Sequence, residues 1–224
     1  FARSAETLSR VGRVLYQEDI PDRLNHRLLI ARDAFAYSGS ETQTALAPGL
    51  NRLSKLFREV TEVDMALNGL DQWSEAQRTV QAAEFWQTFS DWIDRHNPRM
   101  SYSVARNLFI ASKIESSVLE SAQLVKQQAT ERMKSLLPRG TLLCLPTTPF
   151  CAPRVNLPIH ETDALRLQIS VLCCHGGLTG VPHVSIPGAT TGPDHAPIGL
   201  SIIAGHNYDT DLLAASLALE AQHD

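Results

Sequence analysis

The chain has 224 residues, of which 43% are hydrophobic and 20% are charged, so it is long enough and apolar enough to bury a sizeable core. Its formal net charge of −4 gives no basic excess, which speaks against a nucleic-acid partner. No apolar run reaches the roughly 18 residues that a membrane-spanning helix needs. We therefore expect neither a nucleic-acid partner nor a membrane partner.

The first quarter of the chain alternates between helical and extended patterns. Apolar residues at helical spacing predict an amphipathic helix over Thr7–Leu15, and the apolar run Arg27–Ala31 predicts a buried strand. A second helix is expected over Ser40–Leu56, interrupted near Pro48 and Gly49, because proline removes a backbone donor. The alternating segment Phe57–Val63 predicts a strand.

Residues 70–138 carry no strand pattern and are expected to form an all-helical insertion. Its first helix ends at His96–Pro98, Ser101 is placed to cap the next one, and a third helix covers Glu115–Leu137. Ser116 and Ser117 then occupy solvated helix positions. One face of the first helix carries apolar residues at i, i+4, i+7 and i+8: Phe85, Phe89, Trp92 and Ile93. We expect most of the aromatic residues of the insertion, which include Trp73 and Trp86 as well, to pack in the core.

After this insertion, strands and helices alternate again. We predict strands over Thr141–Leu145, His183–Ile186 and Pro197–Ile203, with a helix over Asp163–Cys174 between the first two. A closing helix follows, capped by Asp209 or Thr210. This order of elements indicates an α/β fold in layers of helix, sheet and helix.

The four cysteines stand inside or beside apolar runs, at Cys144, Cys151, Cys173 and Cys174. Neighbouring residues such as Cys173 and Cys174 make a poor disulfide pair, so we expect reduced, buried thiols and a cytoplasmic location.

The segment Pro146–Pro149, which reads PTTP, follows the first of the three late strands. Ligands of α/β proteins commonly bind at the C-terminal ends of strands, and two prolines hold a loop stiff. This pattern predicts either a pocket wall that includes Thr148 and Phe150 or a rigid turn without a binding role.

The segment Cys173–Gly177, which reads CCHGG, invites two further interpretations. One is a cysteine–histidine nucleophile pair, and the other is a metal site together with Cys144 and Cys151. Successive helical residues point about 100° apart, and zinc sites usually use Cys-x2-4-Cys pairs that this chain lacks. We therefore favour buried, inert cysteines over both interpretations, expect no metal site at this segment, and expect His175 to make a structural hydrogen bond.

The order and spacing of PTTP, LTGVP at Leu178–Pro182, the SIP-type strand and the IGLSII strand at Ile198–Ile203 resemble the last third of amidase-signature hydrolases. The segment that ends in HVSIP most resembles the branch that acts on indole-acetamide-like substrates. The resemblance implies that residues 1–224 are the C-terminal part of one layered domain with a mixed sheet, in which residues 70–138 cover the substrate pocket. It also implies a list of substrate-binding residues: Thr147, Thr148, Phe150, Cys173 and His175.

Amidase-signature enzymes hydrolyse carboxamides through an acyl-serine, with a lysine and two serines as catalytic residues, so the resemblance implies no cofactor and no metal. The Gly/Ser-rich segment that carries the nucleophile is missing here, so we expect no catalytic residue in this chain and place that set upstream of Phe1. The expected partners are a small amide and, across the face left by the missing half, a second copy of the chain. Two alternatives stay open, a non-catalytic scaffold with the same fold and an amidotransferase A-type subunit.

Overall fold

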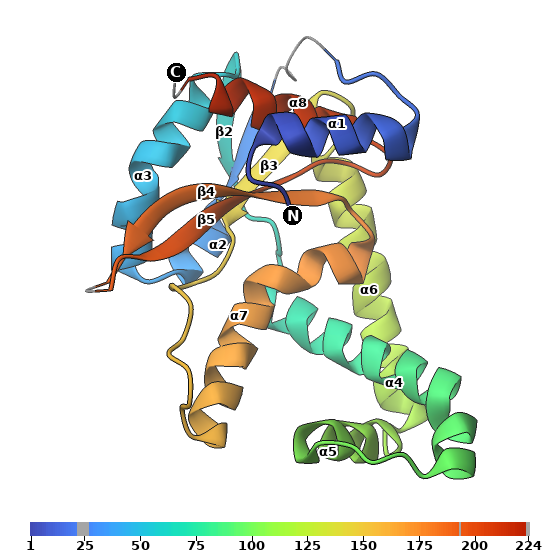
Figure 1. Cartoon of the computed structure of the whole chain (residues 1–224). Helices are drawn as coiled ribbons and strands as arrows, with labels where there is room; N and C mark the ends of the chain where they lie inside the picture. Colours follow the sequence, from blue (N-terminus) through green and yellow to red (C-terminus); the bar gives the residue numbers. More distant parts are fainter. Residues whose placement is uncertain (22–26, 193, 223–224) are drawn as a thin grey trace.

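The computed structural model describes residues 1–21, 27–192 and 194–222. At its centre lies a five-stranded sheet of order β2-β1-β3-β5-β4 (Figure 1). The strands are β1 (Arg27–Ala31), β2 (Glu59–Val63), β3 (Thr141–Pro146), β4 (His183–Thr191) and β5 (Ala196–Ile203). Strand β1 is parallel to β2 and β3, whereas β5 is antiparallel to β3 and β4. This confirms the expected α/β fold with a mixed sheet.

Successive residues of a strand point to opposite faces of the sheet, and here both faces carry apolar side chains. Helices therefore cover both faces. On one face Leu143 and Leu145 share a core cluster with α4 (Leu70–His96), α6 (Ser116–Leu136) and α7 (Ile159–Thr179). On the other face Leu142 and Cys144 pack with α3 (Ser40–Ser54) and α8 (Asp209–Glu220). The remaining helices are α1 (Ala5–Tyr16), α2 (Arg32–Tyr37) and α5 (Tyr102–Ala111).

Helix α3 corrects one prediction, because it runs without interruption through Pro48. Gly49 lies against the sheet so closely that an added Cβ would be 3.3 Å from Leu200 Cδ1 and 3.4 Å from the Gly188 carbonyl oxygen. Leu46 and Leu53 are fully buried on the same side of the helix. Packing of this face outweighs the one backbone hydrogen bond that Pro48 removes.

Helix α7 is longer than the pattern indicated and extends through the glycines to Thr179. Gly176 and Gly177 lie within the helix, and neighbouring side chains occupy the space that a Cβ atom would take at each of them. An added Cβ would lie 3.0 Å from His183 Nδ1 at Gly176 and 2.5 Å from Gln77 Nε2 at Gly177. The helix ends at Gly180, whose φ of 75° is the left-handed conformation that glycine adopts at helix ends.

Two apolar stripes lie on the surface. Helix α1 packs on α8 through Gly12, which meets Leu213, while Val14 and Leu15 are 74% and 72% exposed. The expectation that most aromatic residues of α4 are core was wrong, because Phe85, Phe89 and Trp92 are 41–45% exposed. Trp86 and Ile93 are half-buried. Of the tryptophans, only Trp73 is buried.

Residues 70–138 form the expected helices α4, α5 and α6, and α4 and α5 extend away from the sheet (Figure 1). Ser116 and Ser117 are exposed, as predicted. Ser101 is the N-cap residue of α5, as predicted, although its side chain makes no capping bond. The predicted cap of α8 was wrong, because its N-cap residue is Tyr208. None of the helices in the described parts of the chain combines the length and the apolar character that crossing a membrane requires.

Candidate functional site

Three hydroxyl groups and a thiol meet where β3 ends, on the sheet face that carries α7. Thr147 Oγ1 lies 2.8 Å from Ser185 Oγ and 3.0 Å from Ser201 Oγ. The Cys173 thiol donates to the Thr147 carbonyl oxygen at 3.4 Å. We call these residues, Thr147, Cys173, Ser185 and Ser201, the hydroxyl patch.

The register of the sheet assembles the patch from distant segments. Ser201 of β5 pairs with Leu145 of β3 on one side and with Ser185 of β4 on the other. Thr147 N donates to the Gly199 carbonyl oxygen, so the pairing of this chain segment with β5 extends one residue beyond the end of β3. A Cβ on Gly199 would lie 2.7 Å from Ser185 Oγ and 2.9 Å from Thr147 Oγ1, so this glycine leaves the space in which the hydroxyls meet.

The patch is open to solvent on one side, although its base is buried. Ser201 is buried, Thr147 is half-buried, and Ser185 and Cys173 are exposed. The prediction of buried thiols therefore holds for Cys144 and Cys174 and is wrong for Cys173, while Cys151 is half-buried. All four thiols are free. Burial raises the pKa of Cys144 and Cys174 to about 12 and raises the pKa of Cys173 as well, so these thiols are protonated at neutral pH.

The PTTP segment forms a turn that is held by one hydrogen bond inside the turn and by one hydrogen bond from α3. The Thr148 hydroxyl donates to the Phe150 carbonyl oxygen at 2.7 Å, and Thr42 of α3 donates to the carbonyl oxygen of the buried Pro149 at 3.0 Å. Phe150 is half-buried. Of the residues expected to bind substrate, the structure thus brings Thr147 and Cys173 together, while the Thr148 hydroxyl closes the turn.

His175 corrects another prediction, because its ring makes no structural hydrogen bond. The side chain is 1% exposed, and neither ring nitrogen has a partner among the described residues. Its neighbour is His183, on the patch side of β4, with ring centroids 5.3 Å apart and a tilt of 56°. Desolvation, with a smaller effect of His183, lowers the pKa of His175 to about 3, and desolvation also lowers the pKa of His183. Both imidazoles are neutral at neutral pH.

Chemically, the patch is a set of uncharged donors and acceptors. Each hydroxyl donates one hydrogen bond and accepts others, so the patch can bind a polar group that is itself neutral. Over the described residues, no group of three or more His, Cys, Asp or Glu side chains is placed to hold a metal ion.

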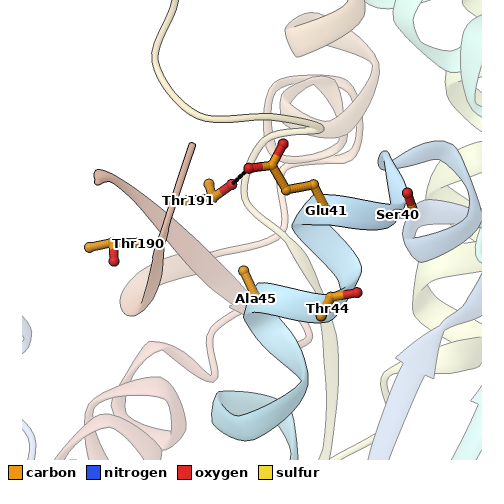
Figure 2. A pocket seen from close by; sticks show the side chains of 6 residues that line it. All are labelled: Ser40, Glu41, Thr44, Ala45, Thr190 and Thr191. Atoms are coloured by element: carbon orange, nitrogen blue, oxygen red, sulfur yellow. Dashed lines mark hydrogen bonds between the residues drawn. The ribbon is translucent and has the colours of Figure 1, made fainter. Parts of the chain in front are cut away.

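A pocket of about 390 Å³ lies on the opposite, α3 side of the sheet, lined by Ser40, Glu41, Thr44, Ala45, Thr190 and Thr191 (Figure 2). The Glu41 carboxylate accepts from the Thr191 hydroxyl at 2.6 Å and from Gly192 N at 2.8 Å. These two bonds lower the pKa of Glu41 and fasten the β4–β5 hairpin to α3. The carboxylate thus has a structural role in joining the hairpin to α3.

A groove of about 440 Å³ lies between α4 and α5 and is lined in part by Phe85, Val104 and Ile110. Part of the exposed aromatic stripe of α4 lines this groove. Helices α4 and α5 extend away from the sheet (Figure 1).

Sequence reasoning missed Ser185, Ser201 and His183 as members of this region. Each lies in a short segment whose pattern indicates only a strand. The pairing of β4 with β5 identifies them, because it brings Ser185 beside Ser201. The alternation of His183, Ser185 and Pro187 with Val184 and Ile186 does indicate that the three share one face.

Comparison with known proteins identifies the family of this chain. The curated relative "Amidase 1" of Arabidopsis thaliana is 22% identical over 251 residues, covering 99% of this chain and 59% of that protein. The A-type subunit of the glutamyl-tRNA(Gln) amidotransferase of Thermus thermophilus is 32% identical over 127 residues, covering 52% of this chain and 25% of that protein. A crystal structure of an amidase superposes with a TM-score of 0.80 at 22% identity, covering 99% of this chain and 51% of that one.

The chain therefore spans between about half and three-fifths of the length of the proteins that it matches end to end. The family model described as Amidase matches residues 4–213, nearly the whole chain. With the mixed sheet and the amidase structure that superposes on it, this match shows that the chain belongs to the amidase family.

Proposed function

We propose that the protein hydrolyses the C–N bond of a carboxamide and that the hydroxyl patch forms part of the wall of its substrate pocket. The observation that carries the proposal is the open, uncharged patch at the end of β3 in a chain of the amidase family. A carboxamide is neutral and carries both a donor and an acceptor. Hydroxyl groups complement both, and they do so without the desolvation cost of a buried charge.

In this proposal the reaction is covalent catalysis by a serine. The serine hydroxyl attacks the amide carbonyl, a neutral lysine takes the hydroxyl proton and delivers it to the leaving nitrogen, and water then attacks the acyl-serine and releases the acid. None of the contacts that build the patch involves a lysine. We therefore place the two serines and the lysine outside residues 1–224, which fits a chain that spans only part of its relatives.

The role left to this chain is positioning. Thr147 and Ser185 would orient the carboxamide, Cys173 would border it, and the rigid turn at Thr148 and Phe150 would hold Thr147 in place. Substrate oriented in this way reacts faster, because orientation removes part of the entropic barrier. Helices α4 to α6 would cover the pocket, as the family resemblance implies.

The test uses the protein expressed from its complete reading frame and a panel of aryl-acetamides and aliphatic amides. Ammonia release should be detected, and Ser185→Ala should change the ratio of kcat/KM between substrates while leaving the melting temperature within a degree or two, because Ser185 is exposed. Ser40→Ala is the matched control, since Ser40 is exposed like Ser185 but lies on α3, on the opposite face of the sheet. No ammonia from any amide would favour the non-catalytic scaffold instead.

A second candidate function is that of an amidotransferase A-type subunit. The observation in its favour is the 32% identity over 127 residues to such a protein, the highest identity among the relatives named above. The two candidates differ in amide donor: a glutamine-dependent release of ammonia that needs partner subunits supports the second, whereas release from simple amides by the protein alone supports the first.

A further inference from the structure

The pair His175 and His183 stands apart from the proposed amide chemistry. His175 is 1% exposed and both of its ring nitrogens lack partners among the described residues. A buried polar group without a partner costs roughly 1–3 kcal/mol, so such a group is expected to meet a ligand or an ordered water. The ring of His183, which is exposed, is the ring that the structure places against it.

The separation of the two rings matches that of two imidazoles on one metal ion. When each ring binds a tetrahedral zinc ion through a nitrogen about 2.0–2.1 Å from the metal, the ring centres stand roughly 5 Å apart. The centroids of His175 and His183 are 5.3 Å apart. A neutral imidazole nitrogen carries the lone pair that binds a metal, and no other group among the described residues occupies either nitrogen of His175.

Local structure holds the pair together. His175 lies in the last turns of α7, and Gly176 beside it admits the His183 ring, since an added Cβ would lie 3.0 Å from His183 Nδ1 and 3.2 Å from its Cε1. His183 is the first residue of β4, which is an edge strand. The thiol of the neighbouring Cys174 is directed elsewhere, because it donates to the Val171 carbonyl oxygen at 3.5 Å.

We infer that His175 and His183 form a two-histidine site for a borderline divalent cation such as Zn²⁺ or Cu²⁺. The ion would connect the C-terminal end of α7 to the first residue of β4, on the sheet face that also carries the hydroxyl patch. Imidazole nitrogens favour Zn²⁺, Cu²⁺ and Ni²⁺ over Mg²⁺ and Ca²⁺, which prefer oxygen. With two protein ligands, the ion keeps open positions for water. This inference does not depend on amide hydrolysis.

The test measures metal binding on untagged protein freed of metal with EDTA and then dialysed. Co²⁺ is titrated and its visible absorption bands are followed, Zn²⁺ is then used to displace it, and the melting temperature is measured with and without Zn²⁺. The variants are His183→Gln and Gly176→Ala, which should push the His183 ring away. The matched control is His160→Gln, because His160 is an exposed histidine at the other end of α7.

We expect Co²⁺ bands that Zn²⁺ abolishes, and a rise in melting temperature with Zn²⁺ in the wild type and in His160→Gln. His183→Gln should weaken Zn²⁺ binding at least tenfold and remove the thermal shift, and Gly176→Ala should weaken binding in the same direction. Absence of any metal-dependent band, or equal Zn²⁺ affinity in the wild type and in His183→Gln, would overturn the site. Mg²⁺ should produce no shift in any variant, and a shift equal to that of Zn²⁺ would also overturn it.

Discussion

Replacing His175 by leucine should stabilise the metal-free protein. It should also make the free energy of unfolding fall less steeply as the pH is lowered. The imidazole is buried without hydrogen bonds, and leucine fills a similar volume with no polar atom. Removing two unpartnered nitrogens from an apolar site should raise the free energy of unfolding at pH 8 by about 1–3 kcal/mol.

The pH dependence follows from the lowered pKa. In the unfolded chain His175 takes up a proton near its ordinary pKa of 6.5, whereas in the folded protein its pKa is about 3. Between these values the unfolded state binds more protons, so stability falls as the pH falls. One pKa unit corresponds to about 1.4 kcal/mol, so the wild type should lose about 3 kcal/mol through this residue over the two pH units between about 6 and 4.

The assay is urea unfolding in EDTA, followed by tryptophan fluorescence, at pH values from 8 to 4. Because the carboxylates titrate in both proteins, the informative quantity is the difference between the free energies of unfolding of His175→Leu and wild type. This difference should grow as the pH falls from about 6.5. A difference that stays constant across this range, or a leucine variant that is less stable at pH 8, would refute the assignment of His175 as an unpartnered buried imidazole.

Three further predictions concern the sheet, the hairpin and the apolar surface. Gly199→Ala should lower the free energy of unfolding by about 1–3 kcal/mol in urea titrations, because its methyl group would overlap Ser185 Oγ and Thr147 Oγ1. Gly39→Ala has open space and should cost less, about 1 kcal/mol at most, because Gly39 is the N-cap residue of α3. Glu41→Gln should reduce stability at pH 7 and less at pH 3, since the lowered pKa of Glu41 means that its stabilisation is complete above pH 4.5 and decreases as the pH falls below it; an equal loss at both pH values in thermal melts would contradict this. Residues 1–224 alone should dimerise or aggregate in light scattering through exposed apolar side chains such as Val14 and Leu15, and a monodisperse, cooperatively melting monomer would count against that surface as an interface.

The parts of the fold that were predictable from the sequence are those whose pattern is local. Thr141–Leu145 is an unbroken apolar run, and it forms the central, fully buried strand β3. Arg27–Ala31 was predicted at its observed bounds for the same reason. The helical character of residues 70–138 also follows from local spacing.

What could not be predicted depends on contacts between distant segments. Pro48 suggests a break in α3, yet the helix continues because Gly49 packs against Gly188 and Leu200 of the β4–β5 hairpin. The aromatic stripe of α4 has core-like spacing, but α6 and α7 occupy the opposite side of that helix.

The candidate site shows the same limit. The PTTP turn marks the end of β3, and Thr147 was therefore within reach of sequence reasoning. Its partners Ser185 and Ser201 become partners only through the register of β3, β5 and β4, which no local pattern encodes.

The most direct test of the central claim is to identify the serine that becomes acylated. The protein from the complete reading frame is mixed with a slowly hydrolysed aryl-acetamide, quenched in acid during turnover, and mapped by peptide mass spectrometry, with Ser185→Ala and Ser201→Ala analysed in parallel. We predict an acyl group on a serine outside residues 1–224, still formed in both variants. An acyl group on Ser185 or Ser201, or its loss in either variant with the fold intact, would contradict a patch that only positions the substrate.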